Sequence, residues 1–147
     1  MHMLGPSSAS DTMYALGVAA LLATCAFAAP ALSGLTIPRA LPSGDVTCGR
    51  NVYTVSQVSS ATSAGFAHRN SPIGSDSYPH QFFNDEGLRL FCSGSSWLEW
   101  PIIEGGTYSG GSPGADRVVF NTAGTYCAVI THTGASSTNG FVSCEND

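Results

Sequence analysis

The sequence predicts an α+β domain in which one α-helix packs on a small twisted antiparallel β-sheet, stapled by disulfide bonds. Three observations predict this fold. One segment has near-helical spacing of apolar residues. Five later segments have the pattern of strands and are separated by turn-forming residues, and four cysteines follow an apolar N-terminal run. The chain of 147 residues has room for one such domain.

The N-terminal region has the pattern of a secretory signal. Residues 13–29 read MYALGVAALLATCAFAA, an apolar run that ends in small residues, and residues 26–28 form the A-x-A motif of a cleavage site. The run is shorter than the roughly 20 apolar residues of a membrane-spanning helix, and no basic flank follows it. The basic residues that usually precede such a run are missing here, so a signal that starts at Met13 is an alternative to one that starts at Met1.

Composition divides the rest of the chain. The segment after the signal, APALSGLTIPRALPSG, is rich in Pro, Ser and Gly and predicts a pro-segment or a linker. We therefore expect a signal peptide at residues 1–28, a pro-segment or linker at residues 29–44 and a folded domain at residues 45–147.

One helix is predicted over Ser56–Ala67. Val55, Val58, Thr62 and Phe66 lie near helical spacing, and Ser56 is placed to cap the first turn. The intrinsic helix propensity of this segment is weak, so packing on the sheet must hold the helix.

Five strands are predicted after the helix, separated by turns such as SGGSPG, NTAG and TGASSTNG. Their expected ranges are Tyr78–Phe83, Trp97–Ile103, Asp116–Asn121, Tyr126–His132 and Gly140–Cys144. A sheet of this size needs one apolar face covered, which is the role of the helix.

Alternation along the strands separates polar from apolar side chains. Leu98, Trp100 and Ile102 share one face of their strand, while Glu99 points to the other. The same rule separates Arg117 from its apolar neighbours. If the apolar sides face the helix, five polar side chains converge on the opposite, exposed face: Tyr78, His80, Glu99, Arg117 and His132. Asp116 has the parity of the apolar side, so we expect a buried, hydrogen-bonded structural carboxylate there.

The cysteines indicate an oxidising compartment. Removal of the signal takes Cys25 and leaves four cysteines, and an even number in a short exported chain implies two disulfides with three possible pairings. Their wide spacing disfavours a zinc site.

Charge and motif content exclude several classes of function. The chain has no lysine, and its formal net charge is −5. Such a chain cannot hold nucleic acid along an extended phosphate track, so an RNA partner must be gripped locally, at one nucleotide. The sequence has no carboxylate cluster or HExxH spacing for a metal-dependent nuclease and no GxSxG for a serine hydrolase, so we expect no metal and no cofactor.

The converging polar set suits phosphoryl transfer from a 5′-oxygen to the neighbouring 2′-hydroxyl. That reaction needs a base for the hydroxyl, an acid for the leaving oxygen and positive charge at the phosphorus. A carboxylate can accept a proton, a histidine can hold one near neutral pH, and the planar fork of an arginine matches phosphate oxygens.

Four motifs resemble the fungal guanyl-specific ribonucleases, in that order and with near-family spacing. They are SYPHQFFNDEG (77–87), LEWPI (98–102), GGSPGADRVVF (110–120) and ITHTGAS (130–136). The resemblance extends from Cys48 to Cys144. It implies a secreted endoribonuclease that cleaves single-stranded RNA 3′ of guanine, through a 2′,3′-cyclic phosphate that is then hydrolysed to a 3′-phosphate.

The resemblance also implies roles for single residues. Glu99 matches the general base, His132 the general acid, and His80 a cation or partial substitute base beside Glu99. The resemblance implies that Arg117 and Tyr78 bind the phosphate and that Phe141 forms an apolar wall.

A guanine pocket is implied at the loop after the first predicted strand. Glu86 would accept the N1–H and 2-amino groups of guanine, Phe82 would offer a stacking face, and Asn139 a backbone acceptor. Backbone groups that read O6 and N7 would come from Phe83, Asn84 and Asp85. The second stacking tyrosine of the family is replaced here by Asp85, which weakens the expected lid over the base.

The resemblance selects one disulfide pairing among the three. Cys48–Cys144 follows the family, and Cys92–Cys127 is similar to a pairing in its purine-preferring branch, whereas Val52 replaces a cysteine that many members have. We expect guanine as the first substrate and adenine as a weaker one.

Two alternatives stay open. The first is a secreted ribonuclease-like effector or toxin that acts by binding a target, although all five candidate side chains are present. The second is a purine-preferring rather than a guanine-specific nuclease. In either case we expect an extracellular monomer whose mature form binds neither DNA nor membrane.

Overall fold

The computed structural model describes residues 41–147, which form an α+β unit. The predicted signal peptide and residues 29–40 of the predicted linker lie outside this part. In the described part no helix has the length and apolar character needed to cross a bilayer. The elements are β1 (Val46–Cys48), β2 (Asn51–Tyr53), α1 (Val55–Ala67), β3 (His80–Phe82), β4 (Trp97–Ile103), β5 (Gly106–Thr107), β6 (Asp116–Asn121), β7 (Tyr126–Thr131) and β8 (Val142–Ser143).

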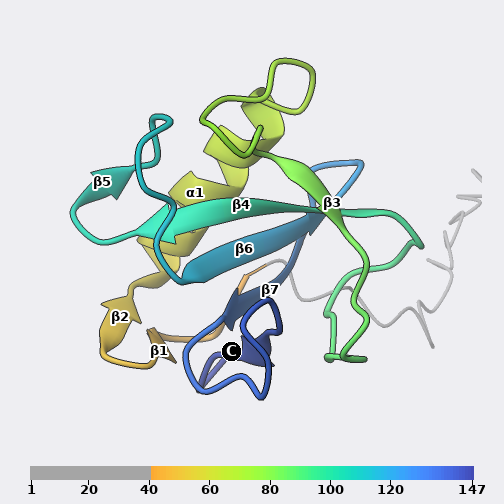
Figure 1. Cartoon of the computed structure of the whole chain (residues 1–147). Coiled ribbons are helices and arrows are strands. Elements are labelled where there is room, and N and C mark those ends of the chain that lie inside the picture. The colour runs from red at the N-terminus through yellow and green to blue at the C-terminus, as the bar shows by residue number, and fades with distance from the viewer. Residues whose placement is uncertain (1–40) are drawn as a thin grey trace, which may run out of the picture. The chain divides into compact units, whose positions relative to one another are not determined.

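The helix α1 lies across one face of β4 and β6 (Figure 1). It is capped by Thr54 rather than by Ser56, so the cap prediction was wrong. Thr54 accepts a hydrogen bond from the backbone of Gln57, and the Gln57 side chain accepts one from the backbone of Thr54, which completes a capping box. Gly65 permits the close approach to the sheet, because an added Cβ would lie 2.8 Å from the Cβ of Trp100.

The main sheet is antiparallel throughout, with strand order β3-β4-β6-β7-β8 and β5 paired to β4. The predicted ranges of β4 and β6 are confirmed in full, whereas β3, β7 and β8 are shorter than predicted. At the start of the last predicted strand, Gly140 N–H donates to the carbonyl of Ser137 and Phe141 N–H to the Glu86 carboxylate, so neither pairs with β7. The β1–β2 hairpin and β5 were not predicted.

Both faces of the main sheet carry apolar clusters. The first cluster packs under α1 and contains Trp100, Val118 and Phe120. The second lies on the opposite face, which was predicted to be exposed. Its buried members are Phe82, Val119, Cys127, Ala128 and Ile130, and its partly buried members are Leu88, Leu90, Cys92, Trp97 and Phe141. The prediction of an exposed face is therefore wrong, because the segment before β4 and the segment before β8 cover it.

Two disulfides hold these layers, with the pairing that the family resemblance implies. Cys48–Cys144 joins β1 to the segment after β8, and the backbone groups of Thr47 and Glu145 bond to each other next to it. Cys92–Cys127 ties the covering segment to β7. At the N-terminal side, Leu41 packs against the first cluster and Pro42 is buried, so the packed unit includes the last residues of the predicted linker.

Candidate active site

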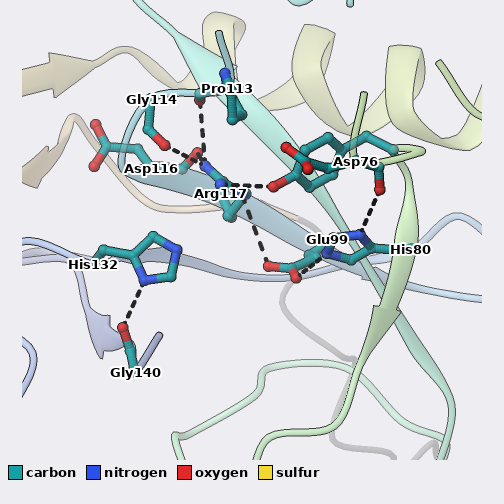
Figure 2. A network of polar contacts seen from close by, with 10 residues as sticks. Asp76, His80, Glu99, Pro113, Gly114, Asp116, Arg117, His132 and Gly140 are labelled. Carbon is teal, nitrogen blue, oxygen red and sulfur yellow. Dashed lines mark hydrogen bonds and ion pairs between the residues drawn. The ribbon is translucent and has the colours of Figure 1, made fainter. Parts of the chain in front are cut away.

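The sheet register brings four of the five polar candidates to one face. His80 pairs with Glu99, and Glu99 pairs with Val119 on β6. Arg117, two residues before Val119, therefore shares their face. His132 follows directly after β7, and its backbone N–H donates to the carbonyl of Ala115. Figure 2 shows the resulting arrangement, with Arg117 and His132 on one side of Glu99 and His80 on the other.

His80 and Glu99 form a short ion pair. The distance from His80 Nε2 to Glu99 Oε1 is 2.5 Å, and His80 Nδ1 lies 3.1 Å from the carbonyl oxygen of Asp76. A carbonyl and a carboxylate both accept, so both ring nitrogens donate, as they do in an imidazolium. The hydrogen bond to Glu99 raises the pKa of His80 above its ordinary value, against partial burial, which lowers it. The raised pKa favours the protonated, cationic form of His80 beside Glu99.

Arg117 is a fixed positive charge beneath the site. Its side chain is buried, with 3% of the residue exposed. Nη1 donates to three carbonyl oxygens, at 3.3 Å to Pro113, 2.9 Å to Gly114 and 2.9 Å to Asp116. These bonds hold the guanidinium in place before any substrate arrives.

Tyr78 completes the set through Arg117. Its hydroxyl accepts a hydrogen bond from Arg117 Nη2 at 2.8 Å, although Tyr78 itself lies before β3 and packs into the first cluster. Burial raises the pKa of the Tyr78 hydroxyl, and the nearby Arg117 opposes that rise. The hydroxyl therefore stays protonated and can donate to an anion.

One buried donor and one buried acceptor face each other without bonding. Glu99 Oε2 and Arg117 Nε are 3.9 Å apart, and neither has a hydrogen-bond partner within residues 41–147. Buried polar groups are nearly always paired, so an unpaired couple of this kind calls for an explanation. A substrate hydroxyl at Glu99 and a phosphate oxygen near Arg117 would satisfy both atoms.

His132 is oriented by the segment before β8. Its Nδ1 lies 2.7 Å from the carbonyl oxygen of Gly140, to which it donates. The Phe141 ring stacks on the imidazole, with 3.9 Å between ring centroids and 26° between planes. The second ring nitrogen points toward the side on which Arg117 and Glu99 lie (Figure 2). His132 is thus held by one nitrogen and offers the other.

Asp116 is a structural carboxylate, as its strand parity predicts. It is 1% exposed and accepts three hydrogen bonds. Asn51 Nδ2 donates at 2.8 Å, the Tyr53 hydroxyl at 2.7 Å and the Thr131 hydroxyl at 2.6 Å. Burial and then the bond to Asp116 raise the pKa of Tyr53 well above its ordinary value. The sequence did not reveal these three partners, because two of them lie on the unpredicted hairpin.

A cleft of about 170 Å³ lies beside these groups. Its lining includes all six residues expected at the guanine pocket, together with Glu99, Phe141 and one residue that was not predicted, Gln81. The base-reading candidates and the general-base candidate therefore share one cleft. The sequence signal that could have found Gln81 is its place between His80 and Phe82.

The turn that carries Glu86 is held by Asn84. The Asn84 side chain donates to the Leu88 carbonyl at 2.9 Å and accepts from the Leu88 N–H at 2.7 Å. Its backbone has φ 54°, and Gly87 N–H donates to its carbonyl at 3.0 Å. The Asn84 side chain and carbonyl therefore both hold the loop in shape.

The two phenylalanines of the cleft differ in exposure. Phe82 is 4% exposed, and its ring packs edge-on against Phe141, so it forms part of the floor. Phe83 is 67% exposed and is the larger free aromatic surface at the cleft. The stacking face expected from Phe82 is therefore small.

The described residues hold no group of three or more His, Cys, Asp or Glu side chains arranged for a metal ion. What they do hold is a carboxylate, a histidine and a buried arginine on one face of the sheet, with a tyrosine hydroxyl bonded to the arginine. This set can move protons and stabilise an anion.

Comparison with known proteins gives consistent matches. A family model described as ribonuclease matches residues 41–145. Guanyl-specific ribonuclease Ap1 of Aspergillus pallidus is 52% identical over 103 residues, which are 68% of this chain and 97% of that protein. Guanyl-specific ribonuclease T1 of Aspergillus oryzae is 53% identical over 68% of this chain and 78% of its own length.

Two further matches add a location and a fold. Extracellular guanyl-specific ribonuclease Fl1 of Gibberella baccata is 49% identical over 68% of this chain and 95% of that protein. The solved structure of a ribonuclease from Hericium erinaceus superposes with a TM-score of 0.50 at 37% identity, over 69% of this chain and 99% of the other.

Proposed function

The chain belongs to the family of the fungal guanyl-specific ribonucleases, and from that premise we propose that it is a secreted endoribonuclease that cleaves single-stranded RNA 3′ of guanine. One observation carries the proposal. A carboxylate and a histidine lie on one sheet face with a buried arginine between their strands, next to a cleft whose rim carries a second carboxylate.

The first step is a transphosphorylation. Glu99 takes the proton of the ribose 2′-hydroxyl, and the 2′-oxygen attacks the phosphorus. The bond from phosphorus to the 5′-oxygen breaks, and that oxygen leaves with a proton from His132. A 2′,3′-cyclic phosphate remains on the guanosine.

The second step runs in the opposite direction. His132, now neutral, takes a proton from water, and the water oxygen attacks the cyclic phosphate. The 2′-oxygen leaves with the proton that Glu99 holds, which gives a 3′-phosphate. In both steps Arg117 and Tyr78 supply donors for the phosphoryl oxygens, Arg117 and His80 supply positive charge, and Phe141 keeps water from the developing charge.

Base selection takes place at the Glu86 carboxylate. Guanine presents N1–H and 2-amino donors on one edge, and a carboxylate can accept both, whereas adenine lacks these donors. Backbone groups of Phe83, Asn84 and Asp85, with Asn139, read the remaining polar atoms of the base. The exposed Phe83 ring gives a stacking surface in place of a tyrosine at Asp85.

Export fits the same function. One relative is named extracellular, and structural disulfides persist in oxidising compartments. We therefore assign residues 1–28 to a signal peptide, place the mature enzyme outside the cell as a monomer, and infer that DNA and membranes are not its partners.

Digestion of a short RNA with a single guanine tests the function. Folded, disulfide-intact protein should give one cut, with a cyclic phosphate and later a 3′-phosphate after the guanine. Adenine in place of guanine should slow the cut, cytosine or uracil should nearly abolish it, and the DNA of the same sequence should resist because it lacks the 2′-hydroxyl. Intact RNA would overturn the proposal, and equal cleavage after adenine would make the enzyme a purine-preferring nuclease.

A further inference from the structure

We propose that the Glu86 carboxylate also positions His132, so that one side chain couples base recognition to acid catalysis. The inference rests on the proposed function and goes beyond it, because it makes Glu86 a positioning residue for the chemistry as well as a ligand for guanine.

A short chain of contacts connects the two side chains. Phe141 N–H donates to Glu86 Oε1 at 2.9 Å, across 55 residues of sequence. The Phe141 ring stacks on the His132 imidazole at 3.9 Å, and the carbonyl of the adjacent Gly140 accepts from His132 Nδ1 at 2.7 Å. Two consecutive residues thus contact the carboxylate on one side and the imidazole on the other.

Glu86 projects from a turn that is itself held in place, so it can restrain Gly140 and Phe141. The side chain of Asn84 bonds to both backbone groups of Leu88 and so fixes the turn from which Glu86 projects. The segment it holds is less secured, because residues 136–139 are exposed and regular pairing with β7 begins only at Val142. The bond to Glu86, together with the packing of the Phe141 ring on Phe82, therefore fixes Gly140 and Phe141 relative to the cleft.

Guanine and Phe141 can share the carboxylate. Its two oxygens offer about four lone-pair sites, of which Phe141 N–H takes one and the two guanine donors take two more. A bound guanine and the Phe141 contact then hold the same carboxylate in place from two sides. By linkage, the effect of guanine binding on the Phe141 contact equals the effect of that contact on guanine binding.

Two variants separate the recognition of guanine by Glu86 from its positioning of His132. Glu86→Gln keeps an acceptor oxygen for Phe141 N–H but replaces the second oxygen with a donor, which conflicts with the guanine edge. Glu86→Ala removes both contacts. The substrates are the dinucleotides GpC and ApC, because adenine lacks the two donors that Glu86 reads. Glu104→Ala, which removes an exposed carboxylate just after β4, controls for the change in net charge.

The kcat for ApC is the decisive measurement. We expect Glu86→Ala to lower it about tenfold with KM unchanged, and Glu86→Gln to lower it less because the amide oxygen still accepts from Phe141 N–H, while the control Glu104→Ala stays within about twofold of the parent protein. Both Glu86 variants should lose far more activity on GpC than on ApC. In parallel, the Phe141 amide should exchange slowly in the parent protein and in Glu86→Gln, and fast in Glu86→Ala.

The outcomes keep the two proposals apart. If Glu86→Ala turns over ApC with the parental kcat, or if its Phe141 amide stays protected, the coupling is refuted while guanine-specific cleavage stands. If the parent protein fails to cut GpC, the proposed function falls first.

Discussion

Asp116→Asn should destabilise the domain by about 3 kcal/mol, because it disturbs a buried carboxylate that accepts three hydrogen bonds. An amide keeps one acceptor oxygen, which can still receive Asn51 and Tyr53, but each bond to a neutral acceptor is weaker than one to a charge, by roughly 1 kcal/mol. The amide N–H₂ then meets the Thr131 hydroxyl, which already accepts from Thr133 N–H. A buried hydroxyl proton is left without an acceptor, at a cost of about 1–3 kcal/mol.

Urea unfolding at neutral pH, followed by tryptophan fluorescence with both disulfides intact, measures the loss. The midpoint should fall while the slope m stays the same, and the melting temperature should fall by on the order of 10–15 °C. Asp45→Asn removes an exposed charge of the same kind and should change stability by less than about 0.5 kcal/mol. A loss below about 1 kcal/mol for Asp116→Asn would refute the reasoning that these bonds hold β2 to the sheet.

Three other changes and one reagent give distinct outcomes. Glu99→Gln should lower kcat on a single-guanine RNA by about 10²–10⁴-fold, since the base is lost while the shape is kept, and a loss under about tenfold would exclude Glu99 as the base. Because the pKa of His80 is raised in the folded protein, protonated His80 stabilises the fold below about pH 6.5, and this contribution is lost as pH rises through the folded-state pKa. The stability deficit of His80→Asn should therefore be largest near pH 6 and shrink toward pH 9. A deficit independent of pH would contradict this. Phe83→Ala should raise KM about tenfold with kcat unchanged, while Val52→Ala, which truncates another exposed large apolar residue, should leave both constants as they are. EDTA should not change turnover, and inhibition by it would show that a metal takes part.

Strand alternation predicted the part of the site that lies on long, regular strands. β4 and β6 are six or seven residues long, enough for a period of two to appear, and their parity placed Glu99 and Arg117 on the face opposite the helix. Convergence with His80 needed the register between strands, which the alternation of single strands does not contain.

Short elements escaped prediction because two or three residues carry no period. The β1–β2 hairpin is of this kind, and with it the donors Asn51 and Tyr53 of the Asp116 cluster. The cap of α1 was misplaced by two residues, since Thr54 and Ser56 are both good caps and the side chain of Gln57 decides between them.

Burial of the catalytic face could not be foreseen from the strands alone. Ala128 and Ile130 share the parity of His132, which showed that this face is partly apolar, but the covering segment is irregular in its backbone. Contacts such as Glu86 with Phe141 join loops far apart in the sequence, and only the folded chain reveals them.

The Cys48–Cys144 bond closes a covalent ring that contains every residue assigned to the cleft and its chemistry. A protease that cuts once inside this ring leaves two pieces joined through sulfur, so a nicked molecule loses no part of its site to dilution. Cuts outside the ring only shorten the tails. Nicked protein should therefore migrate as one band in electrophoresis until a thiol reductant is added, and only then separate into fragments.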